Sequence, residues 1–281
     1  MSGTGKPART PGRKRSSQGG GRPPASGRSS EPAVKVAVVA GRRPVTEAIR
    51  AGDATEVLVS RDARTTEGLR AVFEAAREAG VPIRTTDDAE LDALATDHRG
   101  VVAKVQTERA TSRQLSERGL AGFAFAEDAV VVVLDGIMDP QNLGAAARSA
   151  VAAGAAMLVT RTRRGAEVTP VAIRASAGAL LHLPHARVAN ITRAIERLQE
   201  SGFFVIGLDD EAAATVYDEP CPPGRIAIVI GSEGEGMSRL TREHCDALVS
   251  LPMHGRVGSL NAAASLAATL YAFILPSRAK G

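Results

Sequence analysis

Residues 129–136 read AVVVVLDG, an unbroken apolar run rich in β-branched side chains. A strand of this kind is buried on both faces, which is typical of a parallel sheet covered by helices on each side. Further strand-like runs follow, and helical patterns such as residues 190–202 separate them; the runs occupy residues 155–160, 203–209, 225–231 and 247–253. This alternation predicts an α/β fold built on a parallel sheet.

A smaller α/β pattern precedes that run. Strand-like runs alternate there with helical patterns, with strands expected at 34–41, 56–60, 81–85 and 100–105 and helices at 42–52, 65–79 and 87–95. The stretch that follows has scattered charges and no periodicity, as expected of a linker. The sequence therefore predicts a domain over residues 34–107, a linker over 108–128 and a second domain over 129–281.

The net charge of +4 is unevenly distributed. Residues 1–33 carry seven Lys or Arg and one Glu, so the rest of the chain is slightly acidic. A segment so rich in Gly, Ser, Pro and Arg has little to bury and is expected to be disordered. Its cations suit a phosphate backbone, although a purely solubilising leader remains the alternative.

Composition narrows the function classes. No apolar run approaches the roughly 18 residues of a membrane span, and no secretory signal is evident, so a cytoplasmic protein is expected. Cys221 and Cys245 are isolated, which suggests neither disulfides nor a metal site. Aromatic residues make up 3% and Trp is absent, so any RNA recognition must rest on pockets and phosphates rather than on base stacking.

Three segments that follow strand-like runs carry candidate chemistry, namely 135–150, 231–238 and 252–267. Ligands of parallel sheets bind at the carboxyl ends of the strands. In the first segment Asp139 and Pro140 form a turn, and Asn142 stands near a helix start, six residues before Arg148. Considered without the rest of the chain, this segment favours Asn142 as a helix cap and Arg148 as a solvated side chain over a functional role for either.

The second segment is rich in glycine, but its glycines do not form GxGxxG and no Gly-Lys-Ser/Thr follows. Glu233 and Glu235 would repel a pyrophosphate, so the loop suits a neutral adenine edge or a ribose instead. In the third segment Ser259 and Asn261 precede a helix of Ala and Leu, for which simple N-capping is the alternative explanation.

Together, and in this order, the three segments resemble the SpoU/TrmH family of knotted SPOUT methyltransferases. The resemblance spans about residues 34–276. Asn142 and Arg148 match the first motif, Gly231–Ser238 the second, and Leu251-Pro252-Met253 with Ser259-Leu260-Asn261 the third. The stretches GEGMSRLTREHCD and SLPMHGRV resemble the family's 23S rRNA guanosine 2′-O-methyltransferases. GRRPVTEAI and HRGVVAKV resemble that subgroup's small RNA-binding domain with a ribosomal-protein-like fold.

The resemblance implies a C-terminal trefoil knot, a homodimer with an active site shared between subunits, RNA as substrate and S-adenosylmethionine as cofactor, without a metal. The small-residue helices after Asn142 and Asn261 would permit close packing in such a dimer. The implied catalytic residues are Asn142, Arg148, Glu233, Ser259 and Asn261, and the implied backbone contacts to the cofactor come from Gly231, Leu251 and Leu260.

Arg148 is the family's proposed general base. A guanidinium with a pKa above about 12 rarely releases its proton, so a grip on phosphate and stabilisation of the developing alkoxide is the alternative role. Gly258, Ala262 and Ala263 depart from the family pattern, which bears on substrate preference more than on activity.

Several other functions stay open. Within the enzyme class they are ribose methylation of tRNA and antibiotic-resistance methylation of rRNA. Outside it, a catalytically silent ribosome assembly factor is disfavoured by the intact Asn142, Arg148 and Ser259. A dinucleotide-dependent oxidoreductase is disfavoured by the missing glycine fingerprint.

Overall fold

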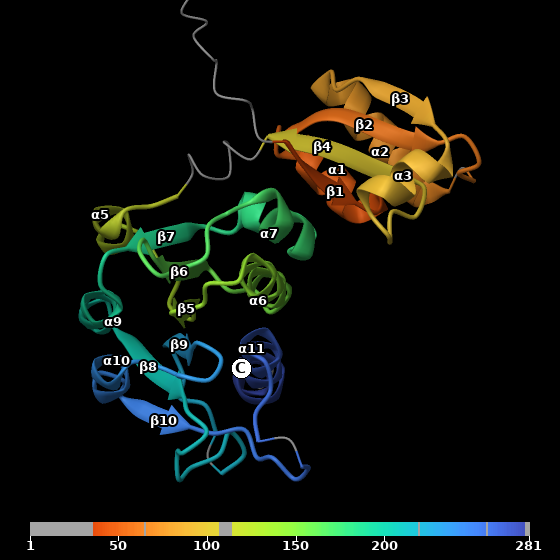
Figure 1. Ribbon diagram of the computed structural model, residues 1–281. Helices are drawn as coiled ribbons and strands as arrows, with labels where there is room; N and C mark the ends of the chain where they lie inside the picture. Colours follow the sequence, from red (N-terminus) through yellow and green to blue (C-terminus); the bar gives the residue numbers. More distant parts are fainter. Residues whose placement is uncertain (1–35, 65, 107–113, 219, 257, 279–281) are drawn as a thin grey trace, which may run out of the picture. The chain divides into compact units, whose positions relative to one another are not determined.

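A computed structural model describes residues 36–64, 66–106, 114–218, 220–256 and 258–278. The predicted basic extension over residues 1–33 and the first part of the predicted linker lie outside the described residues. The described chain forms a four-stranded sheet and a six-stranded sheet, each with its own helices (Figure 1).

The four-stranded sheet belongs to the N-terminal domain and has the order β1-β4-β2-β3. β2 runs parallel to β3, and β4 pairs antiparallel with β1 and β2. The strands and helices predicted for this domain are all present: β1 (Val36–Ala40), α1 (Arg42–Arg50), β2 (Ala54–Ser60), α2 (Glu67–Ala79), β3 (Ile83–Thr86), α3 (Asp88–Leu94) and β4 (Val101–Gln106).

Alternating side chains give this sheet two apolar faces. Val39 and Val57 belong to the apolar cluster that includes residues of α1 and α2, whereas Val38 and Leu58 pack with Leu91 of α3. The helices therefore cover both faces of the sheet.

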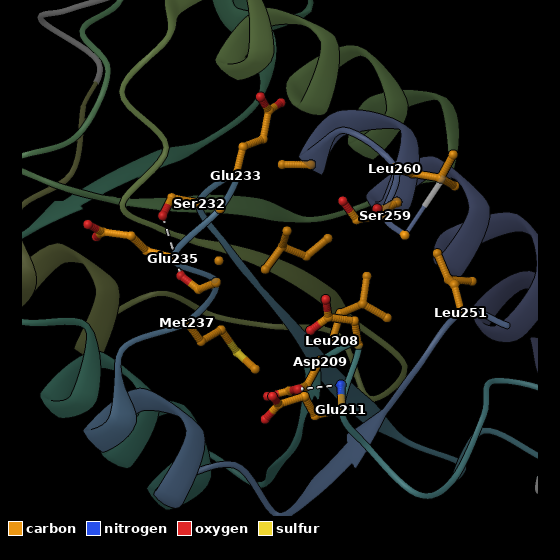
Figure 2. Close-up of a pocket in the computed structure, with 18 of the residues that line it drawn as sticks. Leu208, Asp209, Glu211, Ser232, Glu233, Glu235, Met237, Leu251, Ser259 and Leu260 are labelled. Atoms are coloured by element: carbon orange, nitrogen blue, oxygen red, sulfur yellow. Dashed lines mark hydrogen bonds between the residues drawn. The ribbon is translucent and has the colours of Figure 1, made fainter. Parts of the chain in front are cut away.

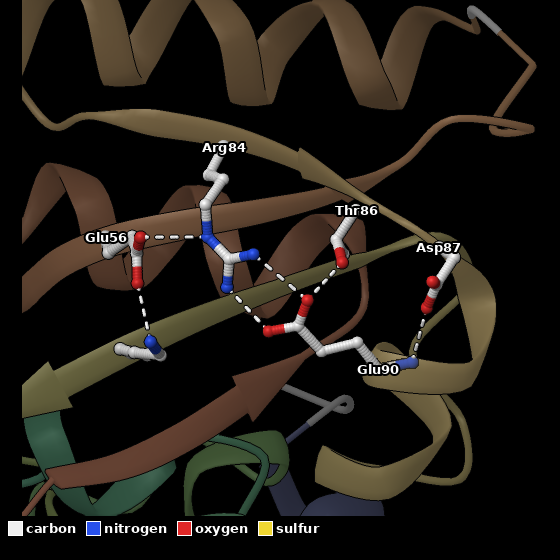
Figure 3. Close-up of polar contacts among 6 residues, drawn as sticks. Glu56, Arg84, Thr86, Asp87 and Glu90 are labelled. Carbon is white, nitrogen blue, oxygen red and sulfur yellow. Dashed lines mark hydrogen bonds and ion pairs between the residues drawn. The ribbon is translucent and has the colours of Figure 1, made fainter.

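A network of ion pairs runs across strands β4, β2 and β3 of this domain to α3 (Figure 3). Arg84 on β3 lies 2.6 Å from Glu90 of α3 and 3.3 Å from Glu56 of β2, and Lys104 of β4 lies 2.6 Å from Glu56. Hydrogen bonding to Arg84, assisted by the Thr86 hydroxyl, lowers the pKa of Glu90 to about 2. Because these groups face solvent, they tie the elements together with only a modest gain in stability.

The six-stranded sheet is parallel throughout, as predicted, with the order β10-β8-β9-β5-β6-β7. Its strands are β5 (Val130–Asp135), β6 (Met157–Arg161), β7 (His185–Val188), β8 (Phe203–Leu208), β9 (Arg225–Gly231) and β10 (Ala247–Val249). All six residues of β5 are buried, in agreement with its position inside the sheet. β10 ends at Val249, earlier than the run 247–253 suggested, and β7 had no counterpart among the predicted strands.

Helices cover both faces of this sheet (Figure 1). Val132 and Leu134 of β5 belong to the cluster that contains residues of α6, α7 and α11, whereas Val131 and Val133 belong to the cluster that contains residues of α9. The helices on the first side are α6 (Pro140–Ala152), α7 (Pro170–Ala175), α8 (Ala179–His182) and α11 (Ala262–Thr269), the last continuing through the π-helix Leu270–Ile274 into α12 (Leu275–Arg278). Those on the other side are α5 (Glu117–Ala121), α9 (Ile191–Glu200) and α10 (Arg239–Glu243).

The packing of α6 against α7 requires a residue without a side chain at Gly144. A Cβ atom at this position would lie 2.4 Å from the carbonyl oxygen of Ala172 and 2.6 Å from Cβ of Ala175, both on α7. Contacts this short do not occur between unstrained atoms, so only glycine allows α6 and α7 to approach so closely. The small residues after Asn142 thus serve packing within one chain.

Candidate active site

A cavity of about 440 Å³ opens at the carboxyl ends of β8 and β9 (Figure 2). Its walls come from residues 208–211 at and after the end of β8, residues 230–237 at and after the end of β9, Arg242 of α10, and positions between 251 and 265 before and within α11. A volume of this size suits a cofactor or a small ligand. The tertiary structure therefore brings the second and third sequence motifs together at one site.

The loop after β9 folds back tightly onto its own strand. Ser232 and Gly236 exchange backbone hydrogen bonds of 3.0 and 2.9 Å, and Gly234 and Gly236 have φ values of 85° and 66°. A Cβ atom on Gly231 would lie 2.0 Å from the carbonyl carbon of Gly236, so no other residue fits there. Glycine at these positions brings the loop backbone to the wall of the cavity.

Asp135, at the end of β5, holds the far end of that loop. Its carboxylate accepts a hydrogen bond from the backbone N–H of Ser238 (3.0 Å) and forms an ion pair of 2.7 Å with Nη2 of Arg161. Asp135 is only 3% exposed. A buried carboxylate held by two donors gives the loop a rigid anchor on the sheet.

A chain of three side chains joins all three motifs at the rim of the cavity. Asn261 is the N-cap of α11, because its Oδ1 accepts from the backbone N–H of Ala264 (2.8 Å). Its amide Nδ2 donates to Oδ1 of Asn142 (3.0 Å), and Nδ2 of Asn142 donates to Oε1 of Glu233 (2.9 Å). Capping sets the orientation of the first amide, which sets that of the second. The side-chain N–H donors of Asn261 and Asn142 therefore both point along this chain in the direction of Glu233.

The predicted site residues fall into three groups. Five line the cavity, namely Gly231, Glu233, Leu251, Ser259 and Leu260. Asn142 and Asn261 reach it through the hydrogen bonds at its rim. Arg148 lies exposed on α6 away from the cavity lining, and it makes no hydrogen bond or ion pair with another described residue.

The interpretation of Asn142 as a helix cap is wrong, because Asp139 caps α6 by accepting from the backbone N–H groups of Gln141 and Asn142. For Asn261 the capping explanation is confirmed, and the same side chain also reaches Asn142. One residue therefore fills both roles.

The floor of the cavity holds charges that sequence reasoning missed. Arg242 of α10 contacts Asp209 through Nε (2.6 Å) and Nη2 (2.8 Å), and its Nη2 lies 3.1 Å from Glu211. The signal available was the position of Asp209 at the end of the strand-like run 203–209. Besides the guanidinium of Arg242, the described lining of the cavity carries five carboxylates. They belong to Asp209, Asp210, Glu211, Glu233 and Glu235. The cavity therefore favours a cationic ligand.

Comparisons with known proteins agree with this geometry. The profile of the SpoU rRNA Methylase family matches residues 129–271, and that of the RNA 2′-O ribose methyltransferase substrate binding domain matches residues 38–110. The chain belongs to the SpoU rRNA methylase family. This SpoU chain is 38% identical over 228 residues to the 23S rRNA (guanosine-2′-O-)-methyltransferase RlmB of Xanthomonas campestris pv. campestris, covering 79% of its own length and 88% of the relative.

Two further SpoU relatives extend the comparison. An uncharacterized tRNA/rRNA methyltransferase of Mycolicibacterium vanbaalenii is 40% identical over 237 residues, with 83% of this chain and 74% of the relative covered. The crystal structure of the SpoU methyltransferase AviRb from Streptomyces viridochromogenes, in complex with the cofactor AdoMet, matches with a TM-score of 0.63 and 27% identity, covering 88% of this chain and 92% of that one. The chain is thus an RNA ribose methyltransferase that uses S-adenosylmethionine.

The cavity fits that cofactor. S-adenosylmethionine supplies an electrophilic methyl group on a positively charged sulfur, and the carboxylate-rich lining complements this charge. Leu208, Ile230, Leu251 and Leu260 add apolar walls beside the backbone of the glycine-rich loop. The described residues would hold the cofactor by backbone contacts on the loop side and by charge on the floor.

No helix among the described residues is long and apolar enough to cross a membrane, and no group of three or more His, Cys, Asp or Glu residues among them is arranged to hold a metal ion. Cys221 is buried, and Cys245 is a free thiol. Burial raises the pKa of Cys245 to about 12, so that thiol stays protonated at neutral pH.

Proposed function

We propose that this chain methylates the ribose 2′-hydroxyl of a guanosine in 23S rRNA. The observation that carries the proposal is the hydrogen-bonded chain from Asn261 through Asn142 to Glu233 at the rim of the acidic cavity. The substrate follows the relatives named as RlmB, of which that of Salmonella typhi is 37% identical over 211 residues. The substrate-binding domain matched at residues 38–110 supports an RNA that needs contacts beyond the catalytic pocket.

Each site residue has a proposed role. The backbone of Gly231, Leu251 and Leu260 contacts the cofactor. Asn142, Ser259 and Asn261 orient the ribose for attack in line with the methyl group, a task in which positioning supplies much of the rate. Glu233 accepts from Asn142 and keeps its amide turned toward the cavity rim.

Arg148 completes the site from a second copy of the chain in the proposed homodimer. Its exposure on α6, away from the cavity lining of its own chain, supports this arrangement. A permanently charged guanidinium stabilises the developing alkoxide and grips the neighbouring phosphate.

The proposed architecture follows the same family. Residues 34–107 form an RNA-binding domain with a ribosomal-protein-like fold, residues 108–128 connect it, and residues 129–281 form the catalytic domain. Its C-terminal segment makes a trefoil knot around the cofactor site. The protein acts in the cytoplasm, and the basic residues of 1–33 add phosphate contacts.

The test is incorporation of labelled methyl groups. The purified chain is incubated with labelled S-adenosylmethionine and, in separate reactions, protein-free 23S rRNA, assembled large subunits and total tRNA, after which the modified nucleotide is mapped. Methylation of a guanosine in 23S rRNA is expected. Incorporation confined to tRNA, or on a uridine or adenosine of 23S rRNA, would overturn the substrate assignment.

A further inference from the structure

The loop between β6 and α7 exposes two arginines that form no ion pair with a carboxylate of the described residues. In the sequence TRTRRGA, Arg163 and Arg164 are exposed, and neither makes a hydrogen bond or ion pair with another described residue. We call Thr162–Ala166 the arginine loop. Guanidinium groups left free in this way suit an anionic partner outside the chain.

The arginine loop is held at both ends. At its start, the backbone N–H of Thr162 donates to the carbonyl of Val188 (2.9 Å), and Nη2 of Arg187 donates to the carbonyl of Thr162 (3.1 Å). At its end, the backbone N–H of Ala166 donates to the carbonyl of Ile137 (2.7 Å). Its two free guanidinium groups therefore extend from a fixed base.

The backbone inside the loop is tightly constrained. Arg164 has a φ of 57°, a conformation that non-glycine residues rarely adopt. A Cβ atom on Gly165 would lie 2.5 Å from the carbonyl oxygen of Arg161, so the chain turns here only with glycine. Unfavourable backbone conformations of this kind persist where the surrounding structure maintains them, and they are frequent at ligand-binding sites.

The arginine loop lies near the candidate active site, beside the segment that leads into the helix of Asn142. β6 pairs with β5, and β5 pairs with β9 of the cofactor cavity, so the end of β6 lies about 10 Å across the sheet from the end of β9. Ile137, which anchors the loop, lies between β5 and the Asp139 cap of the Asn142 helix. Asp135 binds both Arg161 before the loop and Ser238 of the cavity loop.

Two neighbouring regions at this edge of the sheet therefore carry opposite charge. The cavity lining is rich in carboxylates and repels phosphate, whereas the neighbouring loop presents free guanidinium groups. An RNA strand whose target ribose reaches the rim at Asn142 is stabilised when its flanking phosphates lie toward the loop. Arginine binds phosphate through two parallel N–H groups, and this geometry fixes the orientation of the bound phosphate as well as its position.

We propose that the arginine loop is the phosphate clamp of the catalytic domain, binding the RNA backbone beside the methylated nucleotide through Arg163 and Arg164. This inference rests on the proposed function as an RNA methyltransferase. It assigns to the catalytic domain a second phosphate contact, besides the one proposed for Arg148 and besides the RNA contacts of the N-terminal domain.

The test uses the full chain with Arg163→Gln and Arg164→Gln combined. Binding to 23S rRNA is measured across a range of salt concentrations, and S-adenosylmethionine affinity is measured by calorimetry. We expect RNA affinity to fall by about tenfold or more at low salt and the slope of log K against log salt to decrease by about 1 to 2. Cofactor affinity should stay unchanged, because neither arginine lines the cavity.

Matched controls separate this role from general charge. Arg118→Gln with Arg197→Gln removes two arginines of α5 and α9, which cover the other face of the sheet, and the salt slope should then stay as in the wild type. Arg163→Lys with Arg164→Lys keeps the charge and should retain most of the slope. Equal slopes for the Gln variant and the wild type would overturn the clamp. If the wild type methylated no RNA, the proposed function on which this inference rests would be overturned instead.

Discussion

Replacing Asn142 by Asp tests the hydrogen-bonded chain with a change of one functional group. Asn142 donates from Nδ2 to Glu233 (2.9 Å) and accepts on Oδ1 from Asn261 (3.0 Å). Aspartate can still accept from Asn261. It cannot donate, so its second oxygen faces the carboxylate of Glu233 at hydrogen-bond distance.

The expected cost follows from two contributions. A hydrogen bond to a charged acceptor contributes about 1.5–3 kcal/mol, and two carboxylates about 4 Å apart repel by about 1 kcal/mol in a water-like dielectric. Glu233 is exposed, so the smaller values apply. A total of about 2.5 kcal/mol corresponds to roughly 70-fold in kcat/KM. Asn142→Ala loses the hydrogen bond without the repulsion and should lose only about tenfold.

The assay is methyl transfer to 23S rRNA between about pH 5 and pH 8. Repulsion raises the pKa of paired carboxylates, so the activity of Asn142→Asp relative to Asn142→Ala should recover toward low pH. Asn142→Asp combined with Glu233→Gln restores a donor opposite the new carboxylate and should regain most of the loss. An Asp variant as active as the wild type, or a double variant no better than the Asp variant, would refute the reasoning.

Four further results are expected. Gly144→Ala should lower the free energy of unfolding by about 2 kcal/mol, because overpacking against the Ala172 carbonyl outweighs the better helix propensity of alanine, and an unchanged melting temperature would contradict this. Burial lowers the pKa of His185 to about 4, so below about pH 6.5 the unfolded chain binds a proton at this residue while the folded chain does not. In denaturant titrations the free energy of unfolding should therefore fall from pH 6.5 toward pH 4. The fall should be smaller in His185→Gln. Arg148→Ala should reduce turnover by orders of magnitude with calorimetric cofactor affinity intact, because this arginine does not line the cavity. S-adenosylmethionine should bind more tightly than its uncharged-sulfur product S-adenosylhomocysteine, and equal dissociation constants at low salt would argue against the role of the acidic lining.

The secondary structure was largely predictable, because it depends on local hydrophobic periodicity. The run at 129–136 became the buried strand β5, and the pattern at 190–202 became α9. β7 was missed because His185–Val188 is a short edge strand with two polar side chains. His185 is buried there because Thr160 of the neighbouring strand lies 2.8 Å from its Nε2, a contact that local sequence does not encode.

The sequence by itself determined which residue types were available at the ends of the strands, and their motif order pointed to the family. Only the tertiary structure decided how they combine. Asn142 lies 91 residues from Glu233 and 119 from Asn261, yet the three form one hydrogen-bonded chain. Their meeting depends on β9 pairing with β5 and on α11 packing beside α6. Strand order and helix packing arise from contacts between distant segments, which local periodicity cannot specify.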